Sequence, residues 1–141
     1  MIDIENIVLN TVYEALKAEY PNITFYGEYV EAPASFPCVC LVEDDNSTYQ
    51  ASQDTSLQEN NAELLYTLNV YSNKQIGKKA EAKKIANMAD MVMQNMKFTR
   101  TMLSQIPNVD RSIYRVTARY SAVVAKGTED GENTVFQMYR R

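Results

Sequence analysis

The residues that could do chemistry are few: a pair of cysteines, a pair of aspartates and a small set of arginines. Cys38 and Cys40 form a C-x-C motif, which places both thiols on one face if the segment is a strand. Two sulfur atoms supply half of a tetrahedral zinc site, and the chain has no histidine to complete one. A disulfide between residues two apart would strain the backbone. We therefore interpret the two thiols as reduced side chains that fill a core.

The adjacent aspartates Asp44 and Asp45 follow this apolar run, at a position where carboxylates can hold Mg²⁺. Their neighbours are ordinary asparagines and serines, so a solvated loop is the favoured interpretation and no metal site is predicted. Arg115 and Arg119 would share one face of a strand, with Arg111 nearby, and could grip a phosphate or a carboxylate. The favoured alternative is an exposed sheet face on which these arginines pair with acidic side chains.

The composition argues against an enzyme. None of the 141 residues is a histidine, so neither a Ser-His-Asp triad nor a Cys-His pair can form. The four glycines are scattered and make no loop that could cradle a phosphate. We predict no catalytic residue, no metal and no cofactor.

Two amphipathic helices are predicted. Apolar residues recur at helical spacing over residues 4–19, with Asp3 as the cap and Pro21 just beyond the end. A second helix is predicted from a cap at residues 72–73 to about Met96. Its core stripe is expected to hold Ile85, Met88, Ala89, Val92 and Met96. Its solvent face is expected to hold Lys79, Lys83, Asn87, Asp90, Gln94 and Lys97.

The remaining patterns predict strands. Apolar or alternating runs lie at residues 23–26, 38–43, 62–71, 98–106 and 113–124. The polar stretch 44–61 exceeds the usual connection length, so we interpret it as a long loop that is functional, disordered or a protruding hairpin. A turn and a short strand are predicted within residues 126–141. The expected fold is one α+β domain over residues 1–141: a mostly antiparallel sheet with the two helices packed on it.

The net charge of −4 hides a strong asymmetry along the chain. Residues 1–65 hold twelve acidic residues and one lysine, whereas residues 66–141 hold thirteen basic and six acidic residues. This split predicts contact between the two halves of one fold or between neighbouring copies, and the pI of about 4.9 argues against a nucleic-acid footprint. The ten tyrosines also favour an interface. The candidate interface residues are Glu28, Glu31, Asp44, Asp45, Tyr49, Asp54, Lys78, Lys79, Arg115, Arg119, Arg140 and Arg141.

Four segments of the chain together resemble a known family: residues 36–45, 63–73, 77–83 and 113–120. They are similar to the small tail-terminator or tail-completion proteins of Firmicutes tailed phages and prophages, which include head–tail joining proteins labelled minor capsid proteins. Related proteins cap phage-tail-like bacteriocin particles. The resemblance covers roughly residues 1–125 and implies an α+β subunit of a ring, usually of six copies. It implies no cofactor and no active site.

The resemblance implies three kinds of partner: further copies of the chain, the tail-tube protein, and a head connector or collar protein. DNA passing through the ring could touch it without specific binding. The protein is expected in a virion or phage-tail-like particle after synthesis in the host bacterial cytoplasm, because no signal peptide or membrane-spanning run is seen. The alternatives are a head-side connector ring, either stopper or adaptor, and a generic bacterial protein-binding adaptor module.

Overall fold

The computed structural model describes residues 2–30, 33–48, 61–107, 110–130 and 133–139. In chain order the elements are α1 (Glu5–Glu19), β1 (Thr24–Tyr26), β2 (Cys38–Thr48), β3 (Asn61–Ser72), α2 (Lys78–Asn95), β4 (Thr99–Gln105), β5 (Tyr114–Asp130) and β6 (Asn133–Tyr139). The predicted α+β class with a mostly antiparallel sheet is confirmed. Neither helix in this described part is long and apolar enough to cross a membrane.

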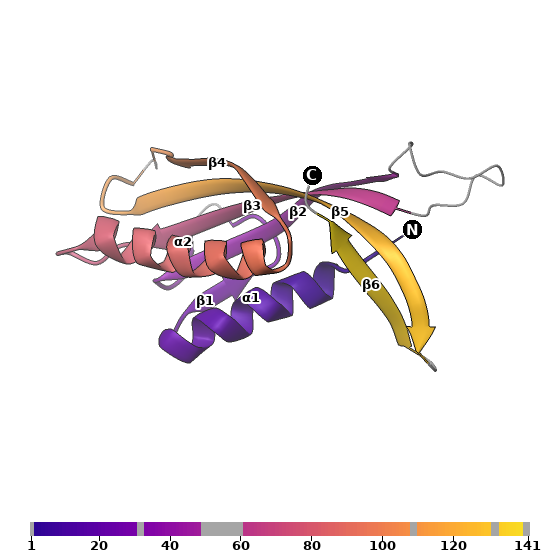
Figure 1. Cartoon of the computed structure of the whole chain (residues 1–141). Coiled ribbons are helices and arrows are strands. Elements are labelled where there is room, and N and C mark those ends of the chain that lie inside the picture. Colours follow the sequence, from indigo (N-terminus) through magenta and orange to yellow (C-terminus); the bar gives the residue numbers. More distant parts are fainter. Residues whose placement is uncertain (1, 31–32, 49–60, 108–109, 131–132, 140–141) are drawn as a thin grey trace.

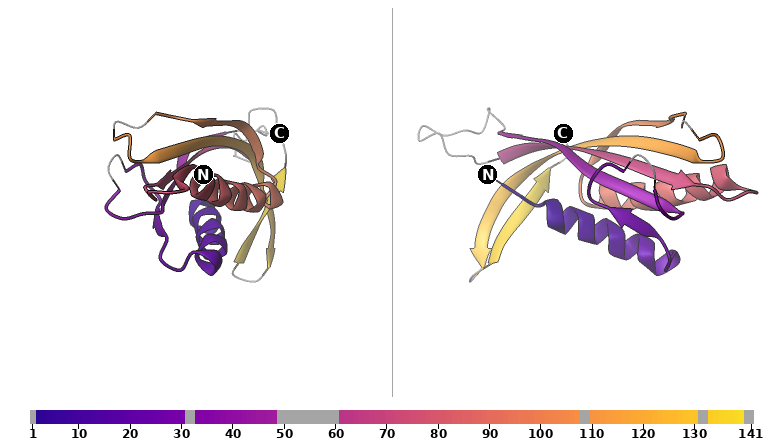
Figure 2. Two further views of the ribbon diagram at one scale, coloured as in Figure 1. Left: turned by 90° about the vertical axis from the view of Figure 1, so that its left-hand side faces the viewer. Right: turned by 180° about the vertical axis from the view of Figure 1, so that it is seen from behind.

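The strands form one sheet in the order β1-β2-β3-β5-β4, and β6 pairs with the second half of β5. Among the strand pairs that the structure describes, only β1–β2 is parallel. Both helices cover the same side of the sheet, so the other side has no helical layer (Figure 1). We call these two sides the helix face and the open face. Beyond Ala125, where its pairing with β3 ends, β5 curves toward the helix face together with β6 (Figure 2).

The main core lies between the helix face and the two helices. Alternation sends one apolar row from each long strand into it, as the sequence predicts. From β3 the buried row is Leu64, Tyr66, Leu68 and Val70, and from β5 it is Tyr114, Val116, Ala118, Tyr120, Ala122 and Val124. Each large aliphatic side chain in these rows contributes roughly 1.5–3 kcal/mol through burial.

The first helix follows the prediction closely, except that Ile4 rather than Asp3 is its N-cap. Val8, Val12 and Leu16 are buried at helical spacing. The helix begins at Glu5, and the Asp3 carboxylate accepts a hydrogen bond of 3.1 Å from the Glu5 backbone N–H. This bond satisfies one of the free donors of the first turn.

The predicted start of the second helix is wrong. The helix begins at Lys78 after Gly77, which has a φ of 88°, and residues 72–73 do not cap it. A left-handed backbone conformation at this point favours glycine, since a Cβ would be strained there. The Ser72 hydroxyl instead donates to the Glu81 carboxylate at 2.8 Å, which ties the end of β3 to the first turn of α2.

The buried stripe of α2 is also rotated from the predicted one. Ala89 and Ile85 are buried as expected, but Val92 is only half-buried. Asp90, which is predicted on the solvent face, is 7% exposed. The physical reason is that polar partners on β4 and β5 bind the Asp90 carboxylate. The buried residues of α2 are Ala82, Ile85, Ala86, Ala89, Asp90 and Met93.

The predicted loop 44–61 is shorter than the sequence suggests. β2 continues to Thr48 and β3 begins at Asn61, so within this predicted loop residues 49–60 are the part that lies outside the described residues. The polar extension of β2 is held by ladder pairing with β3 and by an Asn46 amide that donates to the Ile2 carbonyl at 2.7 Å. At the other end of the chain, β5 runs to Asp130, and the predicted short C-terminal strand is present as β6.

Candidate assembly surfaces

A hollow of about 810 Å³ lies on the open face of the sheet. Its apolar lining comes from Leu65, Met102 and Ile106, and its charged lining from Asp44, Arg115 and Arg119, among others. We call it the open-face hollow. The mixture of arginine, methionine and tyrosine in its walls is typical of protein–protein interfaces.

Arg115 is fixed within the chain at one end of this hollow. Its Nε donates to the Asn69 Oδ1 at 3.0 Å, and the same oxygen accepts from the Thr117 hydroxyl at 2.6 Å. The Arg115 guanidinium also lies 5.6 Å from the centroid of the Tyr71 ring and 5.8 Å from that of Tyr29. Cation–π and hydrogen-bond contacts of this kind hold the side chain in one orientation.

Arg119 lies two residues beyond Thr117 on the same face of β5 and is exposed. Asp44 lines the same hollow and accepts a hydrogen bond from the Thr67 hydroxyl. The next residue, Asp45, is exposed, and a register shift between Glu43 and Asp45 marks a β-bulge here. The structure therefore brings Asp44 and the two predicted arginines together within one subunit.

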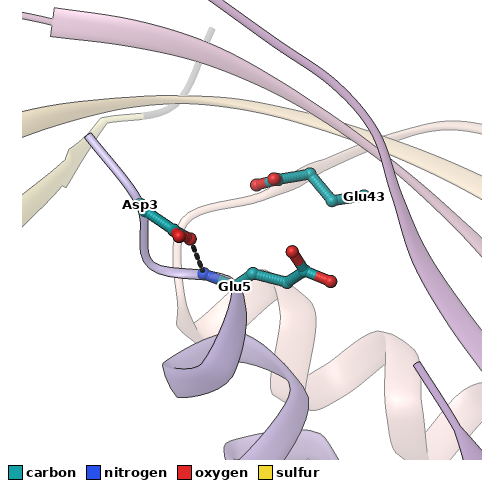
Figure 3. A group of neighbouring side chains, drawn as sticks. All are labelled: Asp3, Glu5 and Glu43. Atoms are coloured by element: carbon teal, nitrogen blue, oxygen red, sulfur yellow. Dashed lines mark hydrogen bonds between the residues drawn. The ribbon is translucent and has the colours of Figure 1, made fainter. Parts of the chain in front are cut away.

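Three carboxylates that the sequence analysis did not single out converge at the start of α1. The carboxylate oxygens of Asp3, Glu5 and Glu43 lie within 4.8 Å of one another (Figure 3). We call this group the acid cluster. The Tyr66 hydroxyl donates to the Glu43 Oε1 at 2.9 Å from the core side. No local pattern in the sequence could reveal this group, because Glu5 and Glu43 are 38 positions apart in the chain and meet only in the folded structure.

Electrostatics distinguish Glu43 within the acid cluster. Burial raises the pKa of the Glu43 carboxyl, and the negative charges of Glu5, Asp3 and Asp45 raise it further. The hydrogen bond from Tyr66 acts in the opposite direction. Among the residues that the structure describes, no lysine or arginine forms an ion pair with the cluster.

The other predicted interface residues are spread widely. Lys78 and Lys79 begin α2, where the Lys78 ammonium donates to the Arg111 carbonyl at 3.1 Å. Glu28 is exposed beside Tyr29, near Arg115 rather than near the acid cluster. The predicted residues Glu31, Tyr49, Asp54, Arg140 and Arg141 lie outside the described residues.

The two thiols fill a small second core on the open face, as predicted. Cys38 and Cys40 are both fully buried and pack with Tyr71. The Cys38 thiol donates to Cys40, which lowers the pKa of Cys40 to about 7 and raises that of Cys38. The nearby Arg115 charge also favours the Cys40 thiolate. Tyr71 lies on the adjacent strand β3, where it is the register partner of Cys38, and packs against both thiols.

Asp90 is a buried carboxylate with a complete set of donors. The Tyr120 hydroxyl donates to its Oδ1 at 2.7 Å, and the Gln94 amide donates to its Oδ2 at 2.7 Å. Arg100 completes the set with an ion pair of 3.0 Å. Burial, and secondarily the bond to Asp90, raises the pKa of the Tyr120 hydroxyl. This network joins α2 to β4 and β5 and fits a structural role.

The chain matches no protein-family model. No curated protein matches it either.

Proposed function

We propose that this protein is a structural subunit of a phage or phage-like tail. In this proposal, copies form a ring, about six in number, that caps the tail tube and ends its polymerisation. The ring also joins the tail to a head connector or collar protein. DNA passes through the lumen without a specific binding site.

One observation carries the proposal: the acid cluster and the pair of arginines lie on opposite faces of the sheet. Glu43 of the acid cluster is the register partner of Tyr66 and bonds its hydroxyl on the helix face. Arg115 and Arg119 line the open-face hollow. Two surfaces of unlike charge on one subunit favour head-to-tail contacts, because a two-fold contact tends to bring like charges together.

The proposal is tested first by the mass of the particle. Native mass spectrometry and sedimentation of the purified chain at low and moderate salt are expected to show a closed oligomer of about six copies. A monomer at all concentrations and salt conditions would contradict the ring.

A second experiment tests the role in the tail. A tail-tube protein from the same genome is allowed to polymerise with and without this chain, and tube lengths are measured by electron microscopy. Tubes are expected to be shorter, and to carry a terminal ring, when the protein is present. Unchanged tube lengths with no bound ring would contradict the capping role and favour a head-side connector or an adaptor.

A further inference from the structure

The open-face hollow is lined by two arginines and one carboxylate, that of Asp44, so its charged lining is net positive. Arg115 directs its Nε to Asn69, and its terminal nitrogens belong to the planar fork that pairs with carboxylates. Arg119 lies four residues after Arg115 on the same face of β5, about 13 Å further along the strand at a rise of roughly 3.3 Å per residue. Because Arg119 is exposed, its guanidinium can reach a carboxylate of another molecule.

The acid cluster, by contrast, concentrates negative charge without a described cation beside it. Three carboxylates lie within 4.8 Å of one another, and their described donors, the Tyr66 hydroxyl and the Glu5 backbone N–H, carry no positive charge. Like charges at this separation repel one another, and the repulsion is strongest where burial lowers the local dielectric. A cation supplied from outside would relieve this repulsion.

The two surfaces lie on opposite sides of the sheet. Glu43 points to the helix face, where Tyr66 and the start of α1 lie, whereas Arg119 and the hollow belong to the open face. One subunit can therefore use both surfaces at once with two different neighbours. A contact between two unlike surfaces is heterologous and closes into a ring when the rotation allows.

We propose that the open-face hollow receives the acid cluster of a second copy of this chain, with Arg119 pairing with Glu5 or Asp3 of that copy. This inference rests on the proposed ring and names the contact that builds it. Arg115 orders the floor of the hollow through Asn69 and the tyrosines, so Arg119 is the residue that sets the charge pairing. Apolar contact with Leu65 and Met102 contributes much of the affinity, as is usual where charges act mainly on register and rate.

The experiment is a charge swap. Arg119→Glu and Glu5→Lys are each expected to weaken assembly about tenfold or more, measured by native mass spectrometry and sedimentation at fixed concentration and moderate salt. The double variant, Arg119→Glu with Glu5→Lys, restores the opposite-charge pair and is expected to recover most of the assembly. Circular dichroism and thermal melting check that each variant is folded.

Two exposed residues supply matched controls. Glu14→Lys makes the same charge change on α1 outside the acid cluster, and Lys83→Glu makes the same reversal as Arg119→Glu on α2. Both controls are expected to assemble like the unmodified chain. If the single variants assemble no worse than these controls, or if the double variant fails to recover, the proposed contact is wrong.

Other outcomes separate this contact from the ring itself. The Arg119→Glu variant could still form the ring, and the ring of the unmodified chain could dissociate in a chelator. Together these two results would show that a divalent cation occupies the acid cluster. That result overturns this inference and leaves the ring intact. An unmodified chain that stays monomeric overturns both.

Discussion

Two groups of carboxylates on the helix side of the sheet meet opposite electrostatic conditions. The Asp90 carboxylate is surrounded by donors from its own chain, including the Arg100 guanidinium at 3.0 Å. The acid cluster gathers three carboxylates, and its described hydrogen bonds come from uncharged donors. Asp90 is also the more buried of the two groups, at 7% exposure.

The difference separates a structural site from the proposed assembly site. A buried carboxylate is tolerated when donors and a cation offset its loss of hydration, and it then fixes the elements that supply them. Crowded carboxylates without a cation destabilise the isolated subunit, and the free energy falls when another molecule brings positive charge. On this argument Asp90 serves the fold, whereas the acid cluster fits the proposed contact between copies.

The largest expected effect comes from removing the compensated carboxylate. Asp90→Ala leaves the Tyr120 hydroxyl buried without its acceptor and the Arg100 charge without its partner. We expect a loss of about 3 kcal/mol in the free energy of unfolding. Urea denaturation in the Arg119→Glu background, where the proposed contact is removed, measures it.

The matched control for this change is Glu14→Ala on the exposed side of α1, which should alter stability by no more than about 0.5 kcal/mol. Equal losses in Asp90→Ala and the control would mean that the Asp90 network contributes little, and the contrast with the acid cluster would disappear.

A smaller loss is expected from Arg100→Met, which removes the cation and keeps much of the apolar stem. The Arg100 side chain is 41% exposed, so solvent screens the ion pair, and we expect a loss of about 1 kcal/mol. A double-mutant cycle with Asp90→Asn isolates the pairwise contribution. Additive losses would show that the hydrogen bonds from Tyr120 and Gln94, rather than the ion pair, hold the carboxylate.

The sequence predicts the helices, the apolar rows of β3 and β5, and the buried thiols because each follows from local periodicity. It misplaces Asp90 because a carboxylate at that position of the helix normally faces water, and the donors that reverse this preference come from residues 100 and 120. The start of α2 is missed because Gly77 begins the helix through a backbone conformation rather than through a capping side chain.

The candidate site is predicted only in part, for a similar reason. Arg115 and Arg119 share the predicted face because strand alternation places them there. The position of Asp44 in the same hollow depends on pairing with β3 and on the bulge beside it, which no local pattern specifies. The acid cluster joins the start of α1 to β2, and a contact between such distant residues needs the folded chain.

The smallest expected effect is a gain rather than a loss in the free energy of unfolding, and it concerns Glu43. Its pKa is raised in the folded chain by burial and by its acidic neighbours, so the folded state prefers the protonated carboxyl. Stability from this preference is fully present below the unfolded pKa of about 4.3 and is lost as the pH rises through the folded pKa. At pH 7, which lies above the unfolded pKa, the Glu43 carboxyl therefore makes the isolated subunit less stable than a neutral side chain would.

Glu43→Gln keeps an oxygen acceptor for the Tyr66 hydroxyl and cannot ionise. In the Arg119→Glu background, where the proposed contact is removed, we expect this change to raise the free energy of unfolding at pH 7 by about 0.5 kcal/mol. Below about pH 3 the gain should vanish, because Glu43 is then protonated in both states. Urea denaturation across this pH range measures the difference. A loss of stability at pH 7 would mean that a cation already compensates the Glu43 carboxylate within the subunit, and the electrostatic contrast between Asp90 and the acid cluster would fail.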